Sequence, residues 1–149
     1  MKRILAFLPK QRATPGLMHL FDHDGVLLHT CPCLGKADND RALNEGNPDR
    51  DPILPYGDTP SGDFKPCKVE RFDPPHARIG WSWIPLSGAS GDAMRAMIGR
   101  TGLGIHAGKG DDRLVPTYGC VRIRDRDMMI LAREIGTDAV TVSIEDMEE

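Results

Sequence analysis

Glycine and proline interrupt this chain from one end to the other, and they limit the length of any helix or strand it can form. Sixteen glycines and twelve prolines are scattered over the 149 residues. Both residue types break regular structure, so the pattern predicts many turns and short elements. The length suits one domain with its own hydrophobic core and is too short for two comfortable ones, so we expect a single domain over residues 1–149.

Apolar runs separated by turn residues predict most of this domain as β-structure. Asp24-Gly25 separates the run 17–22 from the run 26–34, which is a strong signal for a β-hairpin. Further strands are expected at 4–8, at 63–71 after a turn at 59–62, and at 140–144, where apolar residues alternate.

Two segments, 90–100 and 125–135, show helical spacing instead. Ser90 is a candidate N-cap for the first, and Gly136 stands where a C-terminal cap belongs for the second. The apolar positions are Ala93, Met94, Met97 and Ile98 in the first segment and Met128, Leu131, Ala132 and Ile135 in the second. We interpret the methionines as core filling. The predicted fold is mainly β with two helices.

A long polar stretch, 35–58, follows the predicted hairpin. It is too polar for a core element and long for a loop. Long loops in compact domains are often functional covers or mobile segments, and both interpretations apply to this stretch.

Charge and hydropathy exclude several classes of function. A net charge of −3 and a pI near 5.9 argue against nucleic acid as a partner, because phosphate binding needs a basic surface. No run of 18 apolar residues predicts a transmembrane segment. The apolar run at the start of the chain stops at Pro9-Lys10, shorter than the core of a signal peptide. We expect a protein that stays in the cytoplasm or leaves by a route that needs no such signal.

Three of the four cysteines are interpreted as structural thiols. Cys31 and Cys33 alternate along the second strand of the hairpin, and we expect their side chains to face opposite sides of it. That geometry is poor for a shared metal, and a second ligand pair such as zinc sites use is not evident, so no metal site is predicted. Cys67 is assigned to the same inert class.

The fourth cysteine stands in a different setting. Cys120 lies in TYGCVR, residues 117–122, and His106 lies fourteen residues earlier in GIHAG, residues 104–108. We expect a strand that ends at His106, a charged loop that includes 109–113, and a return that brings the thiol to the imidazole. Such a pair can exist as thiolate and imidazolium, which makes the sulfur nucleophilic. The alternative is a buried, inert thiol, which is the commoner role of a free cysteine.

Gly119 supports the interpretation of Cys120 as a nucleophile. Without a side chain beside Cys120, a substrate carbonyl can approach, and the backbone N–H groups can point at one oxyanion.

The ordered motifs of this chain resemble the catalytic domain of the L,D-transpeptidase (YkuD-type) family. That family carries its histidine in a segment like GIHAG, followed by Ser/Thr-x-Gly-Cys-hydrophobic-Arg/Asn, which TYGCVR fits. Upstream, GDTPSGDFK at 57–65 is similar to the family's Gly-x-Thr-Pro-x-Gly turn and strand, and the hairpin at 22–36 resembles its N-terminal hairpin. The resemblance runs from about Leu17 to Ile144. It implies an L,D-transpeptidase-like β-sandwich.

The resemblance also implies a mechanism, acyl transfer on peptidoglycan stem tetrapeptides. Cys120 would attack the carbonyl between an L- and a D-centre and release D-alanine as a thioester forms, with His106 moving the proton. An amine would then resolve the thioester, without a cofactor or metal. Tyr118, Gly119 and Cys120 would supply the oxyanion-binding N–H groups. Arg122 would order the site or meet a substrate carboxylate, and the Thr117 hydroxyl would brace the loop.

Other outcomes remain open within and beyond this family. Tyr118 stands where many members have histidine, and the segment between His106 and Thr117 is shorter than usual. Water in place of the amine would make an L,D-carboxypeptidase, and D-amino-acid exchange is a further option. A different class is a non-catalytic module that binds wall peptide.

The substrate places the protein in the periplasm or cell envelope, whereas the start of the chain shows no clear signal peptide. One resolution is an antibacterial effector that trims stem peptides, is cytoplasmic before export, and has a secretion apparatus and an immunity protein as partners.

Aromatic and histidine residues outside these motifs receive weaker assignments. Trp81 and Trp83 alternate in a strand-like segment and either line a donor pocket or, more commonly for strand aromatics, pack in a core. No role is assigned to the remaining histidines, which are His19, His23, His29 and His76.

Overall fold

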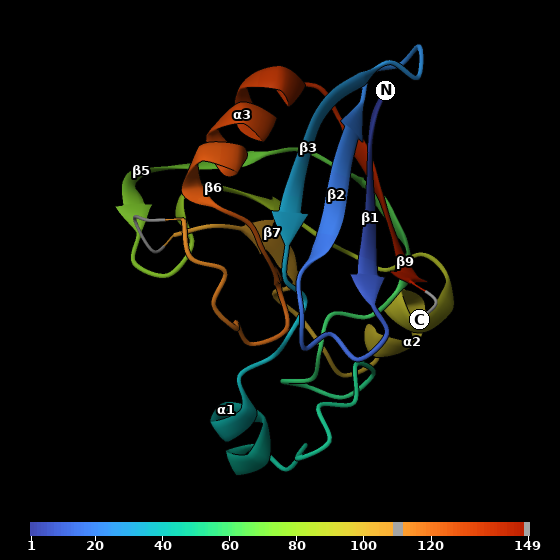
Figure 1. Cartoon of the computed structure of the whole chain (residues 1–149), viewed down its shortest axis with the longest axis vertical. Helices are drawn as coiled ribbons and strands as arrows, with labels where there is room; N and C mark the ends of the chain where they lie inside the picture. Colours follow the sequence, from blue (N-terminus) through green and yellow to red (C-terminus); the bar gives the residue numbers. More distant parts are fainter. Residues whose placement is uncertain (109–111, 148–149) are drawn as a thin grey trace.

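The structure is a computed structural model that describes residues 1–108 and 112–147. In chain order its elements are β1 (Lys2–Pro9), β2 (Gly16–Phe21), β3 (Leu27–Cys33), α1 (Asn39–Asn44), β4 (Gly62–Cys67), β5 (Glu70–His76), β6 (Gly80–Pro85), α2 (Gly91–Ala96), β7 (Gly104–His106), β8 (Val121–Arg122), α3 (Asp125–Ile135) and β9 (Val140–Met147). The described residues form a mainly β fold with two mixed sheets and three helices (Figure 1).

The first sheet has the strand order β3-β2-β1-β9-β4. The predicted hairpin is confirmed as β2 and β3, and its turn uses Gly25 at a φ of 82°, a conformation that glycine adopts without steric cost. The predicted first and last strands are confirmed as β1 and β9. They pair in parallel along their whole lengths in the middle of the sheet, from Lys2 opposite Val140 to Pro9 opposite Met147.

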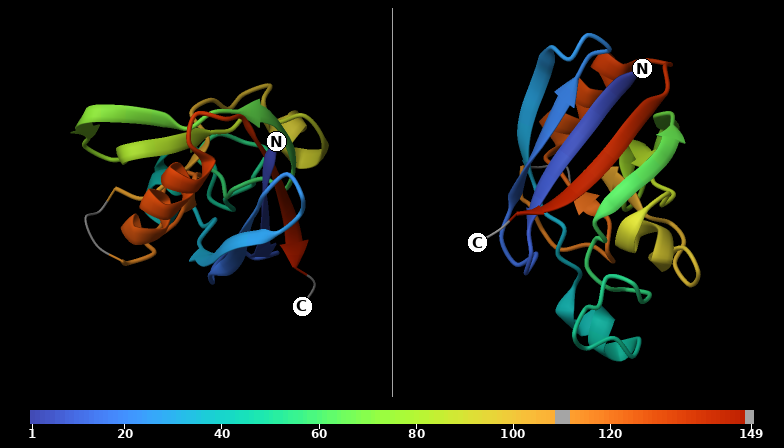
Figure 2. Two further views of the ribbon diagram at one scale, coloured as in Figure 1. Left: turned by 90° about the horizontal axis from the view of Figure 1, so that it is seen from above. Right: turned by 90° about the vertical axis from the view of Figure 1, so that its right-hand side faces the viewer.

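The second sheet has the order β5-β6-β7-β8 and carries the residues of most interest for function. Trp83 on β6 lies opposite His106 on β7, and His106 lies opposite Arg122 on β8, so the three side chains share one face. The alternate positions Ile84, Ile105 and Val121 are fully buried and face the core. The β5–β6 hairpin extends away from the first sheet (Figure 2).

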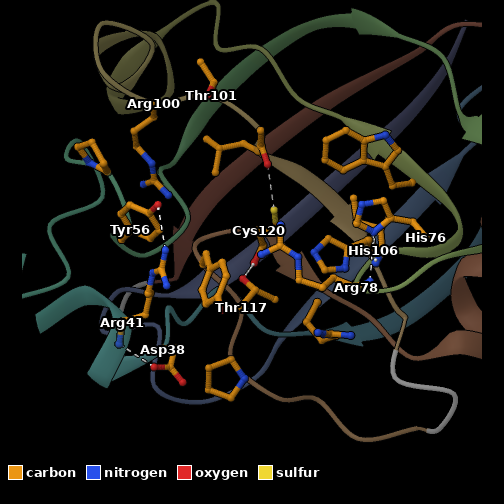
Figure 3. Close-up of a pocket in the computed structure, with 18 of the residues that line it drawn as sticks. Asp38, Arg41, Tyr56, His76, Arg78, Arg100, Thr101, His106, Thr117 and Cys120 are labelled. Atoms are coloured by element: carbon orange, nitrogen blue, oxygen red, sulfur yellow. Dashed lines mark hydrogen bonds between the residues drawn. The ribbon is translucent and has the colours of Figure 1, made fainter. Parts of the chain in front are cut away.

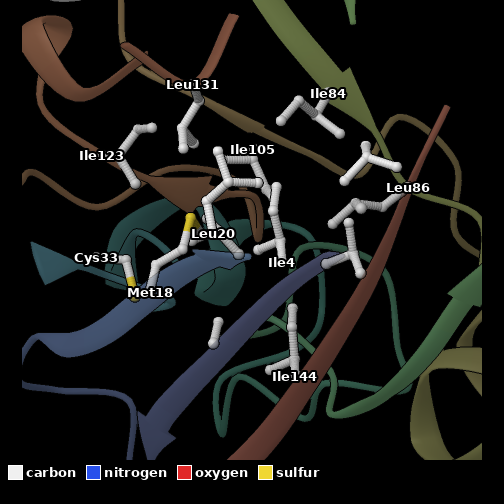
Figure 4. Packing of buried hydrophobic residues seen from close by; sticks show 14 of the residues in the cluster. Ile4, Met18, Leu20, Cys33, Ile84, Leu86, Ile105, Ile123, Leu131 and Ile144 are labelled. Carbon is white, nitrogen blue, oxygen red and sulfur yellow. The ribbon is translucent and has the colours of Figure 1, made fainter. Parts of the chain in front are cut away.

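The hydrophobic core lies between the two sheets and α3. It brings together Ile4 and Leu20 from the first sheet, Ile84 and Ile105 from the second, and Leu131 from α3 (Figure 4). α3 has the bounds that its apolar spacing predicts, and Gly136 is its C-cap residue at a φ of 65°. Within the described residues, no helix has the length and apolar character needed to cross a membrane.

Two predicted elements differ from those observed. The single strand expected over 63–71 is two strands, β4 and β5, which belong to different sheets, because the chain leaves the first sheet after Cys67. The helix expected over 90–100 ends at Ala96. Ile98 is 94% exposed and Met94 and Met129 are also exposed, so these two methionines do not fill the core. Met128 lies in the core and Met97 packs against it, as predicted. Ser90 is the N-cap residue of α2 but makes no capping bond, because its hydroxyl bonds Asp63 instead.

The polar stretch 35–58 is ordered, and it contains a third helix, α1, that the sequence did not predict. Ala37 and Ala42 are its fully buried apolar residues, and polar contacts fix much of the rest. Asp38 caps α1 by accepting from the Arg41 N–H at 2.9 Å. The Asn47 amide donates to the carbonyl oxygens of Asp51 and Pro55 at 3.0 and 3.2 Å. A segment with few apolar residues can hold one shape when its side chains satisfy its own backbone groups.

The prediction that Cys31 and Cys33 face opposite sides of their strand is wrong. Both are buried on the core face of β3. Side chains alternate with a period of two, so residues two apart share a face.

Candidate active site

His106 and Cys120 line one pocket although they lie on different segments. His106 ends β7, and Cys120 directly precedes β8, which pairs with β7 in parallel. The pocket has a volume of about 750 Å³ (Figure 3). It is lined by the loop and helix around α1 (Asp38, Arg41, Pro55, Tyr56), the tip of the β5–β6 hairpin (His76, Arg78, Ile79), residues 99–103 after α2, and both predicted motifs.

Hydrogen bonds fix the turn that carries Cys120. The Thr117 hydroxyl accepts from the Gly119 N–H at 3.0 Å and donates to the Cys120 carbonyl oxygen at 2.8 Å. The Thr59 hydroxyl donates to the Gly119 carbonyl oxygen at 2.7 Å. Thr117 therefore braces the turn. Because the Gly119 N–H is already bonded to Thr117, Tyr118 and Cys120 are left as the candidate N–H donors for an oxyanion.

Arg100 joins the turn to the polar loop. Its guanidinium donates to the carbonyl oxygens of Pro52 at 2.6 Å, Asp58 at 2.9 Å and Gly57 at 3.0 Å. It also lies against Gly119, where a Cβ atom would come within 1.9 Å of its Nη2. Gly119 has a φ of 116°, so both its conformation and its surroundings require glycine.

The imidazole of His106 is neutral and oriented. Nδ1 lies 2.9 Å from the Ala107 carbonyl oxygen, and since a carbonyl only accepts, Nδ1 carries the proton. The pKa of His106 is lowered to about 4, chiefly by burial and also by the nearby charges of Arg122 and Arg78, against the raising effect of the Ala107 bond. Nε2 is therefore available as a base at neutral pH.

The thiol of Cys120 is partly exposed in the pocket, and it donates to the Gly102 carbonyl oxygen at 3.3 Å. Burial raises its pKa, and a backbone hydrogen bond from Gly104 and the charges of Arg100, Arg122 and Arg78 act in the opposite direction. The pocket thus holds a thiol and a neutral imidazole at rest, which differs from the thiolate–imidazolium pair that the sequence pattern allows. The arrangement suits deprotonation during attack.

Arg122 is buried, and it lies opposite His106 in the second sheet. Its Nη1 donates to the Ala107 carbonyl oxygen, the same oxygen that orients His106. Arg122 therefore orders the site, which is one of the two roles considered for it from the sequence.

Part of the pocket wall is a cluster of cations and aromatic rings, of which the sequence analysis identified only Tyr118. The Arg41 guanidinium lies 5.0 Å from the Tyr56 ring centroid and 5.1 Å from that of Tyr118, and Arg78 lies 5.3 Å from the Tyr118 centroid. These distances are typical of cation–π contacts. The polar loop thus forms part of the pocket wall, and Tyr118, two residues before Cys120, contacts two arginines.

The structure places the two tryptophans and two of the remaining histidines. Trp83 lines the pocket, and its ring packs over Gly104. Trp81 is 63% exposed, so the core placement is wrong for it. His76 lines the pocket and His29 bonds Asp127, although neither had an assigned role. The predicted loop 109–113 falls partly outside the described residues, at 109–111.

Comparison with known proteins finds similarity in fold alone. No protein-family model and no curated protein sequence matches the chain. A solved structure of Bdellovibrio bacteriovorus Bd1075 matches with a TM-score of 0.60 and 16% identity, over 97% of this chain and 47% of that chain. The helical cell shape determining protein Pgp2 from Campylobacter jejuni matches with a TM-score of 0.58 and 13% identity, over 99% of this chain and 49% of that chain. The chain thus shares a β-rich fold with proteins of which it spans about half the length.

Proposed function

We propose that this chain is a cysteine acyltransferase of the L,D-transpeptidase type that acts on peptidoglycan stem tetrapeptides. The observation that carries the proposal is the shared pocket of His106 and Cys120, in which the Ala107 carbonyl holds the imidazole in the tautomer with a basic Nε2. A nucleophile, a base and a group that orients the base are the parts that acyl transfer needs.

The reaction follows from these parts. As Cys120 Sγ attacks the carbonyl between the L- and D-centres, its proton passes to His106 Nε2. The N–H groups of Tyr118 and Cys120 stabilise the oxyanion of the tetrahedral intermediate. When the intermediate collapses, the C–N bond breaks, and D-alanine leaves with the proton from His106. An amine of a second stem then attacks the thioester and gives its proton to His106. The C–S bond breaks as the new amide forms, and His106 returns the proton to Cys120 Sγ.

The charge of the pocket supports an anionic substrate. The chain has a net charge of −3, yet Arg41, Arg78, Arg100 and Arg122 line the pocket, and Asp38 is the one acidic residue among the described residues that line it. A stem tetrapeptide carries carboxylates close to the bond that is cleaved. The concentration of positive charge raises the local concentration of such a substrate.

Fold similarity to a protein described as determining cell shape supports a substrate in the cell wall. We place the protein in the periplasm or cell envelope at the time of reaction. An effector that is exported by a secretion apparatus and neutralised by an immunity protein fits the same site.

The decisive experiment follows muropeptides by mass spectrometry. Disaccharide-tetrapeptides are incubated with the purified chain, with Cys120→Ala, and with Cys67→Ala as a matched control for loss of a thiol. Cross-linked dimers that require Cys120 support a transpeptidase, and tripeptides alone support an L,D-carboxypeptidase. Binding without turnover supports a wall-peptide module. Turnover that survives in Cys120→Ala refutes the acyltransferase.

A further inference from the structure

A second cluster of reactive side chains lies between the hairpin and α3. His29 and Cys31, two residues apart on β3, share the face that packs toward α3, and Asp127 lies in the first turn of that helix. One ligand atom from each residue, imidazole nitrogen, thiol sulfur and carboxylate oxygen, lies within 4.8 Å of the other two. His29 Nε2 and Asp127 Oδ1 are 2.8 Å apart.

These separations come close to those that a small divalent ion requires. Zinc binds nitrogen and oxygen at about 2.0–2.1 Å and sulfur at about 2.3 Å, so its tetrahedral ligands lie roughly 3.3–3.7 Å from one another. A side-chain shift of about 1 Å or less is enough to convert the observed cluster into three ligands around one ion. The mixed set of nitrogen, sulfur and oxygen suits zinc and cobalt(II) better than calcium or magnesium.

The surroundings of Asp127 resemble the support that metal ligands receive. Arg124 Nε donates to Asp127 Oδ2 at 2.6 Å, which leaves Oδ1 directed at the cluster. Carboxylate ligands are commonly held in this way by a hydrogen bond to their second oxygen. Asp127 and Cys31 are buried, whereas the His29 side chain is 19% exposed, so an ion has an approach from solvent.

We propose that His29, Cys31 and Asp127 bind one divalent transition-metal ion, zinc by preference, that fastens β3 to α3. Binding displaces the thiol proton to solvent, and water fills the fourth position. The ion takes no part in the acyl transfer proposed above. It stabilises the junction between the hairpin and the helix that begins three residues after Arg122, where Asp125 also accepts a hydrogen bond from the Gly108 N–H at 3.0 Å.

Cobalt(II) tests the site because a cobalt–thiolate bond absorbs in the near ultraviolet. The full chain with Cys120→Ala is the background, so that the pocket thiol contributes nothing. After removal of metal with a chelator, cobalt titration should give the absorption band with one ion per chain, and zinc should displace the cobalt. The band should disappear in Cys31→Ser and persist in Cys67→Ser. His29→Gln and Asp127→Asn should weaken binding at least tenfold.

A purely structural ion pair among His29, Asp127 and Arg124 makes the opposite prediction. An ion pair without a metal site would give no cobalt band and no rise in melting temperature on addition of zinc. The absence of the band, or the absence of the rise, in the Cys120→Ala chain overturns the proposal. A band that persists in Cys31→Ser, or binding only at millimolar zinc, also overturns it. Should Cys31→Ser fail to fold by circular dichroism, the partly exposed His29→Gln decides: unchanged affinity for zinc contradicts the site, and a loss of tenfold or more supports it.

Discussion

His106 and Arg122 share a single hydrogen-bond acceptor, the carbonyl oxygen of Ala107. One bond sets the tautomer of the imidazole, and the other fixes the position of the oxygen that sets it. The charge of Arg122 also lowers the pKa of His106. A single buried cation thus helps to hold the proposed base in place and adds to the lowering of its pKa, which burial dominates.

The first prediction concerns this cation. Arg122→Gln should lower kcat about 10- to 100-fold with little change in KM, because it disturbs the base more than the binding of substrate. Loss of the charge should also raise the pKa of His106 and move the acid limb of the pH–rate profile to higher pH. Arg122→Lys keeps the charge and should leave that limb in place. An acid limb that does not move in Arg122→Gln would show that the residue acts only on packing.

The second prediction concerns stability against pH. The pKa of His106 is lowered to about 4 from an ordinary value of 6.5, so the unfolded chain binds the proton more tightly than the folded one. The folded state therefore loses stability as pH falls from about 6.5 to 4, by about 3 kcal/mol for this residue, and the loss levels off below pH 4. Chemical denaturation at a series of pH values measures this slope.

His106→Gln serves as its control. The variant cannot take up the proton, so its free energy of unfolding should fall less over the same pH interval. Equal slopes in the two proteins would assign the pH dependence to other groups.

The third prediction concerns Gly119. Gly119→Ala should destabilise the fold by about 3 kcal/mol or more, since the new Cβ meets Arg100 and the carbonyl of Gly57 and the φ of 116° disfavours a side chain. Gly25→Ala is the matched control, because Gly25 also has a positive φ, 82°, but has nothing within 4 Å of a Cβ. Its cost should be about 1–2 kcal/mol. If urea denaturation gave similar losses in the free energy of unfolding for the two variants, the turn would accommodate the new side chain without displacing Arg100.

The fourth prediction concerns the cationic wall. Arg78→Gln should raise KM for a stem tetrapeptide about tenfold at low salt, and less at high salt, because the contact it removes is electrostatic. Arg95→Gln removes an arginine of α2 that pairs with Asp92 outside the pocket, so its KM should stay near that of the unchanged chain. Equal KM values for the two variants would exclude Arg78 from substrate binding.

The sequence predicts those parts of the fold that depend on local pattern. The apolar spacing of 125–135 and the cap at Gly136 are enough to give the bounds of α3, and Asp24-Gly25 is enough to place the hairpin. The return from β7 to β8 follows from two motifs on either side of one loop. In each case the residues that decide the structure are neighbours in the chain.

The parts that escape prediction depend on partners far away in the sequence. Arg41, Tyr56 and Arg78 come from separate segments and meet only at Tyr118. α2 stops before Arg100, whose guanidinium instead bonds the carbonyl oxygens of the polar loop. Asp127 and His29 are 98 residues apart. No local sequence pattern predicts these contacts, because the neighbours of each residue in the chain do not indicate its distant partner.

The parallel pairing of β1 with β9 has a consequence for how the chain folds. The first strand, β1, is the central strand of the first sheet, and the last strand, β9, pairs beside it. Strand pairing across such a sequence separation is slow, since the chain must close its largest loop before the contacts form. During synthesis β1, which carries the core residues Ile4, Ala6 and Leu8, lacks its parallel partner strand until β9 has left the ribosome. A nascent chain cut anywhere before Val140 therefore lacks the strand that completes its core, so such fragments are candidates for chaperone binding and degradation instead of partial activity.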